Sequence, residues 1–337
     1  MSKTPTISAV MPAYNAVHHL PKVLPPLLDA LAKGQLVELI VVDDQSTDDT
    51  ADMAANMGAR VLVTPENGGP GKARNLAAEH AVGDILWFVD SDVIAWPDGA
   101  ELIRHAFADP GVHAVFGSYD ETPEGQSLVS RYKNLTHRYH HQGSAREART
   151  FWAGCGAIRA DVFRACGGFD VETYKVPSIE DIELGYRISG AGGRILVLPD
   201  LLGKHLKVWT LKSAVHTDIF RRALPWSRLM IAREGLDDSL NTSWGERMRA
   251  GVAGLFLLAV LGVIVGCLGF GAVLLTAVAA VAINWDYARF LYRHGGIGFA
   301  AGSLTLHQAY YVYSSVAFVW CLFEYHVLGV RDRLHVP

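Results

Sequence analysis

The sequence predicts an α/β domain with a mostly parallel sheet and helices on both faces, followed by interfacial and transmembrane α-helices. Over residues 7–117, short runs rich in Val, Ile and Leu alternate with longer amphipathic stretches. Such strand–helix repeats form parallel sheets covered by helices on both sides. Charge is also unevenly distributed, because the 36 residues from Ala250 to Trp285 contain no Lys, Arg, Asp or Glu. A soluble part joined to a membrane part would give the mean hydropathy of +0.18.

The strands and helices of the N-terminal domain, expected at residues 1–209, follow from this pattern. Short apolar runs bounded by polar, Gly or Pro residues predict buried strands, and longer stretches with helical spacing predict helices. The predicted strands are Ile7–Met11, Leu36–Val42, Ala59–Thr64, Ile85–Val89, Val112–Gly117 and Arg194–Leu198. The predicted helices are His18–Lys33, Asp48–Met57, Gly71–Ala81, Asp98–Ala108, Asp161–Cys166 and Ser178–Gly190. Ligands on such sheets bind beyond the carboxyl ends of the strands.

A basic amphipathic stretch and an apolar block come after this domain. Residues 210–249 place Lys and Arg among Trp and Leu, as in helices that lie on a membrane surface. As one helix, the 36 uncharged residues would reach about 54 Å, against a hydrocarbon core of roughly 30 Å. We therefore expect a membrane domain at 250–337 with spans at Ala250–Val265 and Phe270–Trp285. Ile297–Phe323 is a candidate third span, and the alternative for it is a re-entrant segment, because a third crossing would leave Arg331 and Arg333 outside.

Charge and cysteine content exclude several classes of protein. A net charge of -4 and a pI near 6.4 argue against a nucleic-acid partner. The four cysteines form no CxxC pair, so they indicate neither a metal site nor a disulfide framework. The N-terminal residues lack the pattern of a signal peptide. Arg289 and Arg293 follow the second expected span, and they place the loop there on the cytoplasmic side. We expect a multi-pass protein of the cytoplasmic membrane whose N-terminal domain faces the cytoplasm.

Polar residues follow the first two predicted strands. Carboxylates at a strand's carboxyl end can accept hydrogen bonds from a base N–H or from ribose hydroxyls. Ser46 to Asp48 suit the start of a helix, so we expect them to cap it while the two preceding acids face a ligand. The candidate ligand contacts here are Pro12, Tyr14, Asn15, Asp43 and Asp44.

A glycine-rich turn opens the third predicted helix. Backbone N–H groups at a helix start favour an anion such as a diphosphate, and basic side chains nearby add to the attraction. The candidate residues are Gly71, Lys72 and Arg74. The turn is neither a GxGxxG nor a GxxxxGK[ST] motif, so it indicates neither a dinucleotide enzyme nor a P-loop ATPase.

Two acids separated by one residue end the apolar strand Ile85–Val89. Alternation along an extended chain puts Asp90 and Asp92 on one side of the backbone, where unpaired carboxylates repel each other. A divalent cation would relieve that repulsion, and oxygen ligands suit Mg²⁺ or Mn²⁺ bridging to a diphosphate. We expect Ser91, between them, to contact the same ligand.

A second acid pair, Glu180 and Asp181, lies at a predicted helix start. Ser178 and Asp181 have the spacing of a capping box, which would give Asp181 a structural role. The functional interpretation is a general base, since one carboxylate can hold structure while its neighbour takes a proton.

These motifs, in this order, resemble the family 2 glycosyltransferases of the GT-A fold, from about Ile7 to Trp209. The resemblance implies that Asp90 and Asp92 bind the metal and the donor diphosphate, and that Asp181 is the base. It also implies an inverting reaction, in which a hydroxyl attacks the anomeric carbon as the nucleoside diphosphate leaves. An acceptor-side stretch is implied at Trp152, Gly154, Cys155, Gly156 and Trp209.

His205 lies where related enzymes place a metal-contacting histidine or a Gln/Arg-x-x-Arg-Trp motif. Val208 replaces the arginine of that motif, and few spans are available, so a polymer-extruding synthase is disfavoured. His205 is therefore expected to contact the metal or the diphosphate.

The resemblance implies a UDP- or GDP-linked sugar donor, and the spans favour an acceptor that arrives from the bilayer. A phosphate acceptor needs no base, so the acid pair Glu180 and Asp181 favours a hydroxyl-bearing lipid over the alternative, a polyprenyl phosphate. A membrane-anchored protein that binds nucleotide-sugars without catalysis is the alternative from another class, and a nucleotidyltransferase is a further one.

Overall fold

The computed structural model describes residues 4–143, 145–233 and 243–330, and divides into two compact units. The first unit comprises residues 1–125 and 141–208, and the second comprises residues 126–140 and 209–334. The sequence prediction put residues 126–140 in the N-terminal domain, but they group with the C-terminal helices. Residues 234–242 of the predicted interfacial segment and residues 331–337 of the predicted membrane domain lie outside the described residues.

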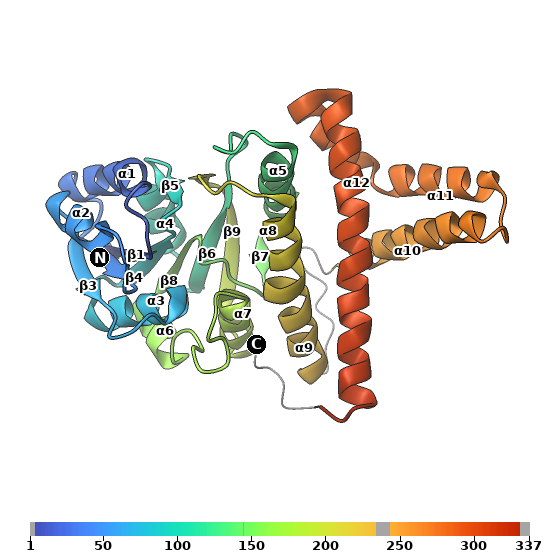
Figure 1. Ribbon diagram of the computed structural model, residues 1–337. Helices are drawn as coiled ribbons and strands as arrows, with labels where there is room; N and C mark the ends of the chain where they lie inside the picture. Colours follow the sequence, from blue (N-terminus) through green and yellow to red (C-terminus); the bar gives the residue numbers. More distant parts are fainter. Residues whose placement is uncertain (1–3, 144, 234–242, 331–337) are drawn as a thin grey trace. The chain divides into compact units, whose positions relative to one another are not determined.

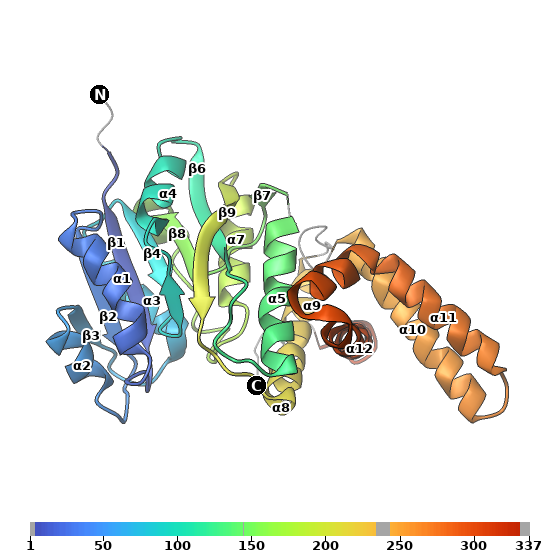
Figure 2. The same ribbon diagram turned by 90° about the horizontal axis from the view of Figure 1, so that it is seen from above.

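The first unit is a sheet with helices on both sides (Figures 1 and 2). Its strands are β1 (Ile7–Ala13), β2 (Glu38–Asp43), β3 (Arg60–Val63), β4 (Ile85–Val89), β5 (Val93–Ala95), β6 (Val112–Tyr119), β7 (Glu147–Ala148), β8 (Cys155–Arg159) and β9 (Arg194–His205). Its helices are α1 (Leu20–Ala32), α2 (Thr50–Asn56), α3 (Gly69–His80), α4 (Gly99–Ala106), α6 (Ala160–Ala165) and α7 (Glu180–Gly190).

The strand order is β3-β2-β1-β4-β8-β6-β9-β5, and β7 pairs with β9. Strands β1 to β4 are parallel to one another, as the predicted strand–helix repeats require. Strand β8 runs antiparallel to both β4 and β6, so the second half of the sheet is mixed. The chain moves from β1 to β2 on one side and returns to β4 on the other, and such a reversal is where open α/β sheets bind ligands.

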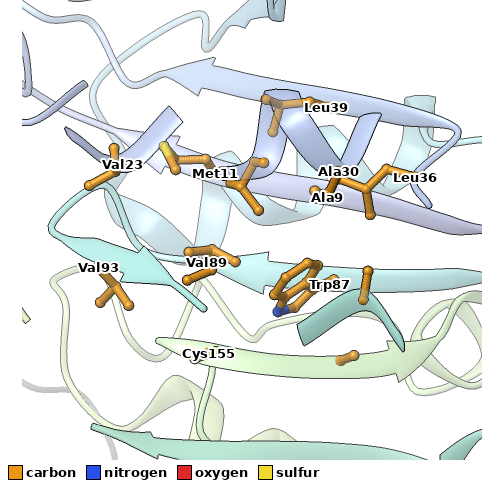
Figure 3. Packing of buried hydrophobic residues seen from close by; sticks show 14 of the residues in the cluster. Ala9, Met11, Val23, Ala30, Leu36, Leu39, Trp87, Val89, Val93 and Cys155 are labelled. Carbon is orange, nitrogen blue, oxygen red and sulfur yellow. The ribbon is translucent and has the colours of Figure 1, made fainter. Parts of the chain in front are cut away.

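Alternate residues of β4 pack on opposite faces of the sheet, which explains why the whole strand is apolar. Trp87 and Val89 face α1 and α4 in a core shared with Met11, Val23 and other residues (Figure 3). Phe88 points to the other face, where its ring contacts the rings of Phe151, Phe163 and Phe169 at centroid distances of 5.5–6.5 Å. Burial on both faces fixes where β4 ends, and thereby positions the acids that follow it.

The second unit is helical. It contains α5 (Leu128–Gly143) as far as His140, then α8 (Leu211–His216), the π-helix η1 (Thr217–Ala223), α9 (Leu224–Ala232), α10 (Trp244–Ile264), α11 (Phe270–Ile283) and α12 (Trp285–His326). In Figure 1, α10 and α11 lie side by side. Helix α12 is kinked at Gly296, whose φ of 73° only glycine adopts readily, and the predicted third span begins at the next residue.

Within the described residues, α10 is the one helix both long and apolar enough to cross a membrane by itself. Helices α11 and α12 pass the same test only together, and they are bent by 76° at their junction. The described residues therefore contain one candidate membrane span, or two if α11 and α12 together form a second span.

Candidate functional site

The polar residues expected to bind a donor follow β1, β2 and β4. These strands are parallel neighbours, so Tyr14, Asp43 and Asp90 come at the same edge of the sheet. Tyr14 is half exposed, at 51%. Asn15 has a φ of 48°, and its side-chain oxygen accepts a hydrogen bond from the backbone of Thr47 at 2.8 Å. The two loops after β1 and β2 are thus joined.

Asp43 is a buried acid with an unused oxygen. The residue is 4% exposed, and its Oδ2 accepts a hydrogen bond from the Ser46 backbone at 3.2 Å. Oδ1 has no hydrogen-bond partner among the described residues. A buried carboxylate oxygen without a hydrogen-bond partner is costly. This atom is therefore suited to accept a hydrogen bond from an N–H or O–H group of a bound molecule.

Asp44 has a structural role. Its Oδ1 accepts hydrogen bonds from the Thr64 hydroxyl at 2.8 Å and the Gly68 backbone at 3.1 Å, and its Oδ2 accepts one from Gly69 at 2.7 Å. We expected Asp44 to face the ligand beside Asp43, but both of its oxygens hold the glycine-rich turn. Gly69 itself needs a φ of 80° there, which suits only glycine.

The glycine-rich turn opens helix α3, as predicted, with Pro70 in its first turn and Gly71 buried. Lys72 forms an ion pair with the exposed Glu66 at 2.7 Å. Before α2, the N-cap residue is Asp49, whose side chain makes no capping bond. Asp48, within the predicted cap, has its Oδ1 accept a hydrogen bond from the Thr50 backbone at 3.1 Å.

Arg74 is the centre of the site's charge network. Its side chain is 5% exposed, Nη2 lies 2.5 Å from Asp90 Oδ1, and Nη1 lies 3.9 Å from Glu180 Oε1. The guanidinium also lies over the Phe169 ring, 5.4 Å from the centroid. Its Nε has no hydrogen-bond partner among the described residues. One buried cation therefore contacts an acid of each predicted acid pair.

Asp92 lies in the turn after β4, and it is close to His205 at the end of β9. Asp92 Oδ2 and His205 Nε2 are 3.6 Å apart, and Asp92's backbone carbonyl accepts a hydrogen bond from Leu206. This separation fits two ligands of one ion, each about 2.1 Å from it. Burial acts to raise the pKa of Asp92, but His205 holds it below the ordinary value, so Asp92 is ionised.

Glu180 and Asp181 occupy the first turn of α7. Glu180 is 7% exposed and accepts a hydrogen bond from the Ser178 backbone at 2.8 Å. Burial, and then the charge of Asp181, raise the pKa of Glu180, while Arg74 opposes the shift. The N-cap residue is Ile179 and not the predicted Ser178, and Ile179 makes no side-chain capping bond.

Asp181 is held by backbone N–H groups of the turn before β8 and of its own helix α7. Its Oδ2 accepts a hydrogen bond from Ala153 at 3.1 Å, and its Oδ1 accepts one from Ile182 at 2.8 Å. Gly185 allows this approach, since a Cβ there would lie 2.3 Å from the Phe151 nitrogen. These two backbone hydrogen bonds therefore fix the direction of the carboxylate.

The expected acceptor-side residues divide between the two units. Trp152 packs edge-on against Tyr119, and the carbonyl of Gly154 accepts a hydrogen bond from the Asp90 backbone at 3.2 Å. Burial raises the pKa of the Cys155 thiol to about 12, so it is no nucleophile. Gly156 pairs with Phe88 in the sheet. Trp209 belongs to the second unit, where it exchanges hydrogen bonds with Ser130.

Two supporting residues, Tyr119 and Asn75, escaped prediction from the sequence. Tyr119 stacks on His205 with ring centroids 4.2 Å apart, which orients the imidazole. Asn75 exchanges hydrogen bonds with the backbone of Phe169 and thus holds the ring under Arg74. These contacts join residues far apart in the chain, and only the glycines before Phe169 signalled a special backbone there.

Residues 8–167 match the family model described as Glycosyl transferase family 2. This stretch contains the ends of β1, β2 and β4 with their acids, and it is similar to the glycosyltransferases of family 2. The predicted resemblance is confirmed over these residues.

Particular relatives match smaller parts of the chain. The pre-mycofactocin glycosyltransferase of Mycobacterium tuberculosis (strain CDC 1551 / Oshkosh) is 31% identical over 198 residues, 53% of this chain and 41% of that protein. The 4,4'-diaponeurosporenoate glycosyltransferase of Staphylococcus haemolyticus is 45% identical over 96 residues, 27% of this chain and 25% of that protein. The chain thus spans less than half of these relatives.

Among solved structures, the mannosyltransferase PcManGT from Pyrobaculum calidifontis, in complex with GDP-Man and Mn²⁺, has a TM-score of 0.55. The match covers 95% of this chain and 88% of that chain at 20% identity. At this identity the likeness shows the fold, and it confirms the predicted GT-A architecture with added C-terminal helices.

Proposed function

We propose that this protein transfers a sugar from a nucleoside diphosphate donor to the hydroxyl of a lipid, in an inverting and metal-dependent reaction. The observation that carries the proposal is the position of Arg74 between Asp90 and Glu180, at 2.5 Å and 3.9 Å. A buried guanidinium there can neutralise a leaving diphosphate beside the base.

The donor's nucleoside lies against the ends of β1 and β2. The unpartnered Oδ1 of Asp43 supports an accepted hydrogen bond from a base or ribose, and the exposed ring of Tyr14 offers a stacking surface. The N-terminus of α3 and Arg74 receive the diphosphate. Asp44 contributes indirectly, by holding the turn.

Asp90, Asp92 and His205 are the residues that would hold Mg²⁺ or Mn²⁺. The 3.6 Å separation of Asp92 and His205 supports this donor set, as does the Mn²⁺ found with PcManGT. The ion would supply positive charge for the departing diphosphate. Ser91 lies between the two acids and contacts the donor.

Asp181 is the proposed base. Its carboxylate takes the proton of the acceptor hydroxyl, the hydroxyl oxygen forms a bond to the anomeric carbon, and the bond from that carbon to the diphosphate oxygen breaks. Attack opposite the leaving group inverts the anomeric configuration. The two backbone hydrogen bonds to Asp181 orient it for this step.

The acceptor is proposed to be a lipid because the second unit has apolar surfaces suited to a bilayer. A cavity of about 1250 Å³ lies among α10, α11 and α12, and most of its lining is apolar. Leu258, Ile264 and Phe270 are among the exposed side chains of α10 and α11. The proposed location is the cytoplasmic membrane, with the catalytic domain on the cytoplasmic side and more than one pass.

Membranes that contain the protein, incubated with radiolabelled UDP- and GDP-sugars, test the proposal. A labelled lipid that survives mild acid is expected, and label found only in soluble product contradicts it. A mild-acid-labile lipid would instead indicate a glycosyl phosphate, and hence a polyprenyl phosphate acceptor. Donor binding without any transfer would favour a non-catalytic binding protein.

A further inference from the structure

A second group of metal-ligating side chains lies in the helical unit. His140 of α5, Glu246 of α10 and His307 of α12 each present one ligand atom, and these atoms all lie within 4.8 Å of one another. Glu246 and His307 are buried, and His140 is partly buried. We propose that these three residues bind a Zn²⁺ ion, at a site separate from the donor site.

The donor set matches zinc chemistry. Two imidazoles and one carboxylate, with a fourth position open to water, are a common zinc set with bonds of about 2.0–2.2 Å. Ligand atoms around such an ion are roughly 3.3 Å apart, so the three side chains need only a small closure. Nitrogen ligands also favour zinc over the Mg²⁺ that all-oxygen sites select.

Neighbouring hydroxyls orient two of the three ligands. The Tyr132 hydroxyl lies 3.0 Å from Nδ1 of His307, which leaves Nε2 for a metal. The Tyr311 hydroxyl donates to Oε2 of Glu246 at 2.6 Å. Outer hydrogen bonds of this kind fix ring orientation and ligand basicity in metal sites.

Aromatic rings enclose His307 on several sides. Its ring centroid is 4.7 Å from that of Tyr287, 4.5 Å from that of Tyr311 and 5.5 Å from that of Tyr310. The centroid of the His140 ring lies 6.4 Å from that of His307. The imidazole is therefore held in place, and the group is assembled before any ion binds.

The positive charge of Arg249 lies beside the proposed site and should weaken metal binding. A variant that lacks this charge should therefore bind the metal more tightly, whereas variants that lack a ligand should bind it more weakly. The Arg249 guanidinium donates to Oε1 of Glu246 and to the Ile283 carbonyl. A fixed positive charge there repels a cation, so removing it must strengthen metal binding. If these side chains served only to stabilise the fold, removing Arg249 would not strengthen metal binding. Glu246 would instead lose its partner, and the helical unit would loosen.

The test uses the full chain in detergent, with Asp90→Asn and Asp92→Asn to remove the donor-site metal. After treatment with a chelator, the protein is titrated with ZnCl₂ alone, and bound zinc is counted by elemental analysis. One zinc per chain is expected. His140→Ala and His307→Ala should each weaken binding by at least about tenfold, and Arg249→Gln should strengthen it.

His294→Ala is the matched control for His307→Ala, since both histidines lie on α12. His294 contacts the Phe290 carbonyl and is not part of the proposed site. The control variant should leave zinc binding unchanged. Far-UV circular dichroism of each metal-free variant checks folding, and His140→Ala, at the most exposed ligand, decides the question if His307→Ala does not fold. No retained zinc, or zinc binding insensitive to His140→Ala, would overturn the proposal. Since no donor is present, the result does not depend on glycosyl transfer.

Discussion

Arg74 donates a hydrogen bond from Nη2 to Oδ1 of Asp90 at 2.5 Å, although the two residues belong to different motifs. The same guanidinium lies 3.9 Å from Glu180, in the acid pair at the start of α7. One buried cation therefore links the acid pair proposed to hold the metal with the acid pair that contains the proposed base. A change at Arg74 should affect both the donor side and the base.

Arg74→Lys should lower kcat/KM for the nucleotide-sugar by about 100-fold, close to 2.7 kcal/mol of transition-state stabilisation. Lysine keeps the charge but cannot contact Asp90 and Glu180 together, because it lacks the planar fork. Steady-state kinetics measure the effect. Arg164→Lys is the control, since Arg164 donates to the carbonyls of Ala78 and Ala81 and should change kcat/KM little.

His205→Ala should weaken Mn²⁺ binding by about 10- to 100-fold, because one of the proposed ligands is lost. Titration of Mn²⁺ against donor binding gives the apparent dissociation constant. His113→Ala, which removes a histidine that accepts a hydrogen bond from the Arg194 backbone, should leave it unaltered. An unchanged value for His205→Ala would remove His205 from the metal site.

Glu180→Gln should make the protein more stable at pH 8 and less active. A raised pKa means that the folded state favours protonated Glu180. The contribution of this group to folding stability is therefore fully present below the unfolded pKa of 4.5 and is lost as pH rises through the folded pKa. Glutamine stays neutral, so the gain in melting temperature should shrink towards pH 4. Thermal melts over this range measure it, with the exposed Glu101→Gln as control; a gain independent of pH would contradict the assignment.

Asp181→Asn should reduce sugar transfer by about 100- to 10,000-fold, the usual contribution of a general base. Donor affinity should change little, because the Ala153 and Ile182 backbones hold Asp181, while Arg74 contacts Asp90 and Glu180. Transfer assays and donor titrations separate these effects. Near-full transfer by this variant would show that another group takes the proton.

Strong local patterns allowed most of the first unit to be predicted. Strand Ile85–Val89 is apolar at every position and bounded by polar residues, so its limits agree with β4. Helix α5 was missed because Leu128–Gly143 is mainly polar, and its buried Leu135 packs against the distant Tyr287 and Leu291. The different roles of Asp43 and Asp44 also escaped prediction, since they depend on hydrogen bonds to residues 64–69. Long-range contacts of this kind leave no local pattern.

A thermal-shift screen of UDP- and GDP-sugars with and without Mn²⁺ tests the donor site most directly, because a ligand that binds the native state raises the melting temperature. One donor should raise it with Mn²⁺ present, and the rise should disappear in the Asp90→Asn, Asp92→Asn variant. An equal rise in that variant, or no rise with any nucleotide-sugar, would contradict a metal-dependent donor site at these strand ends.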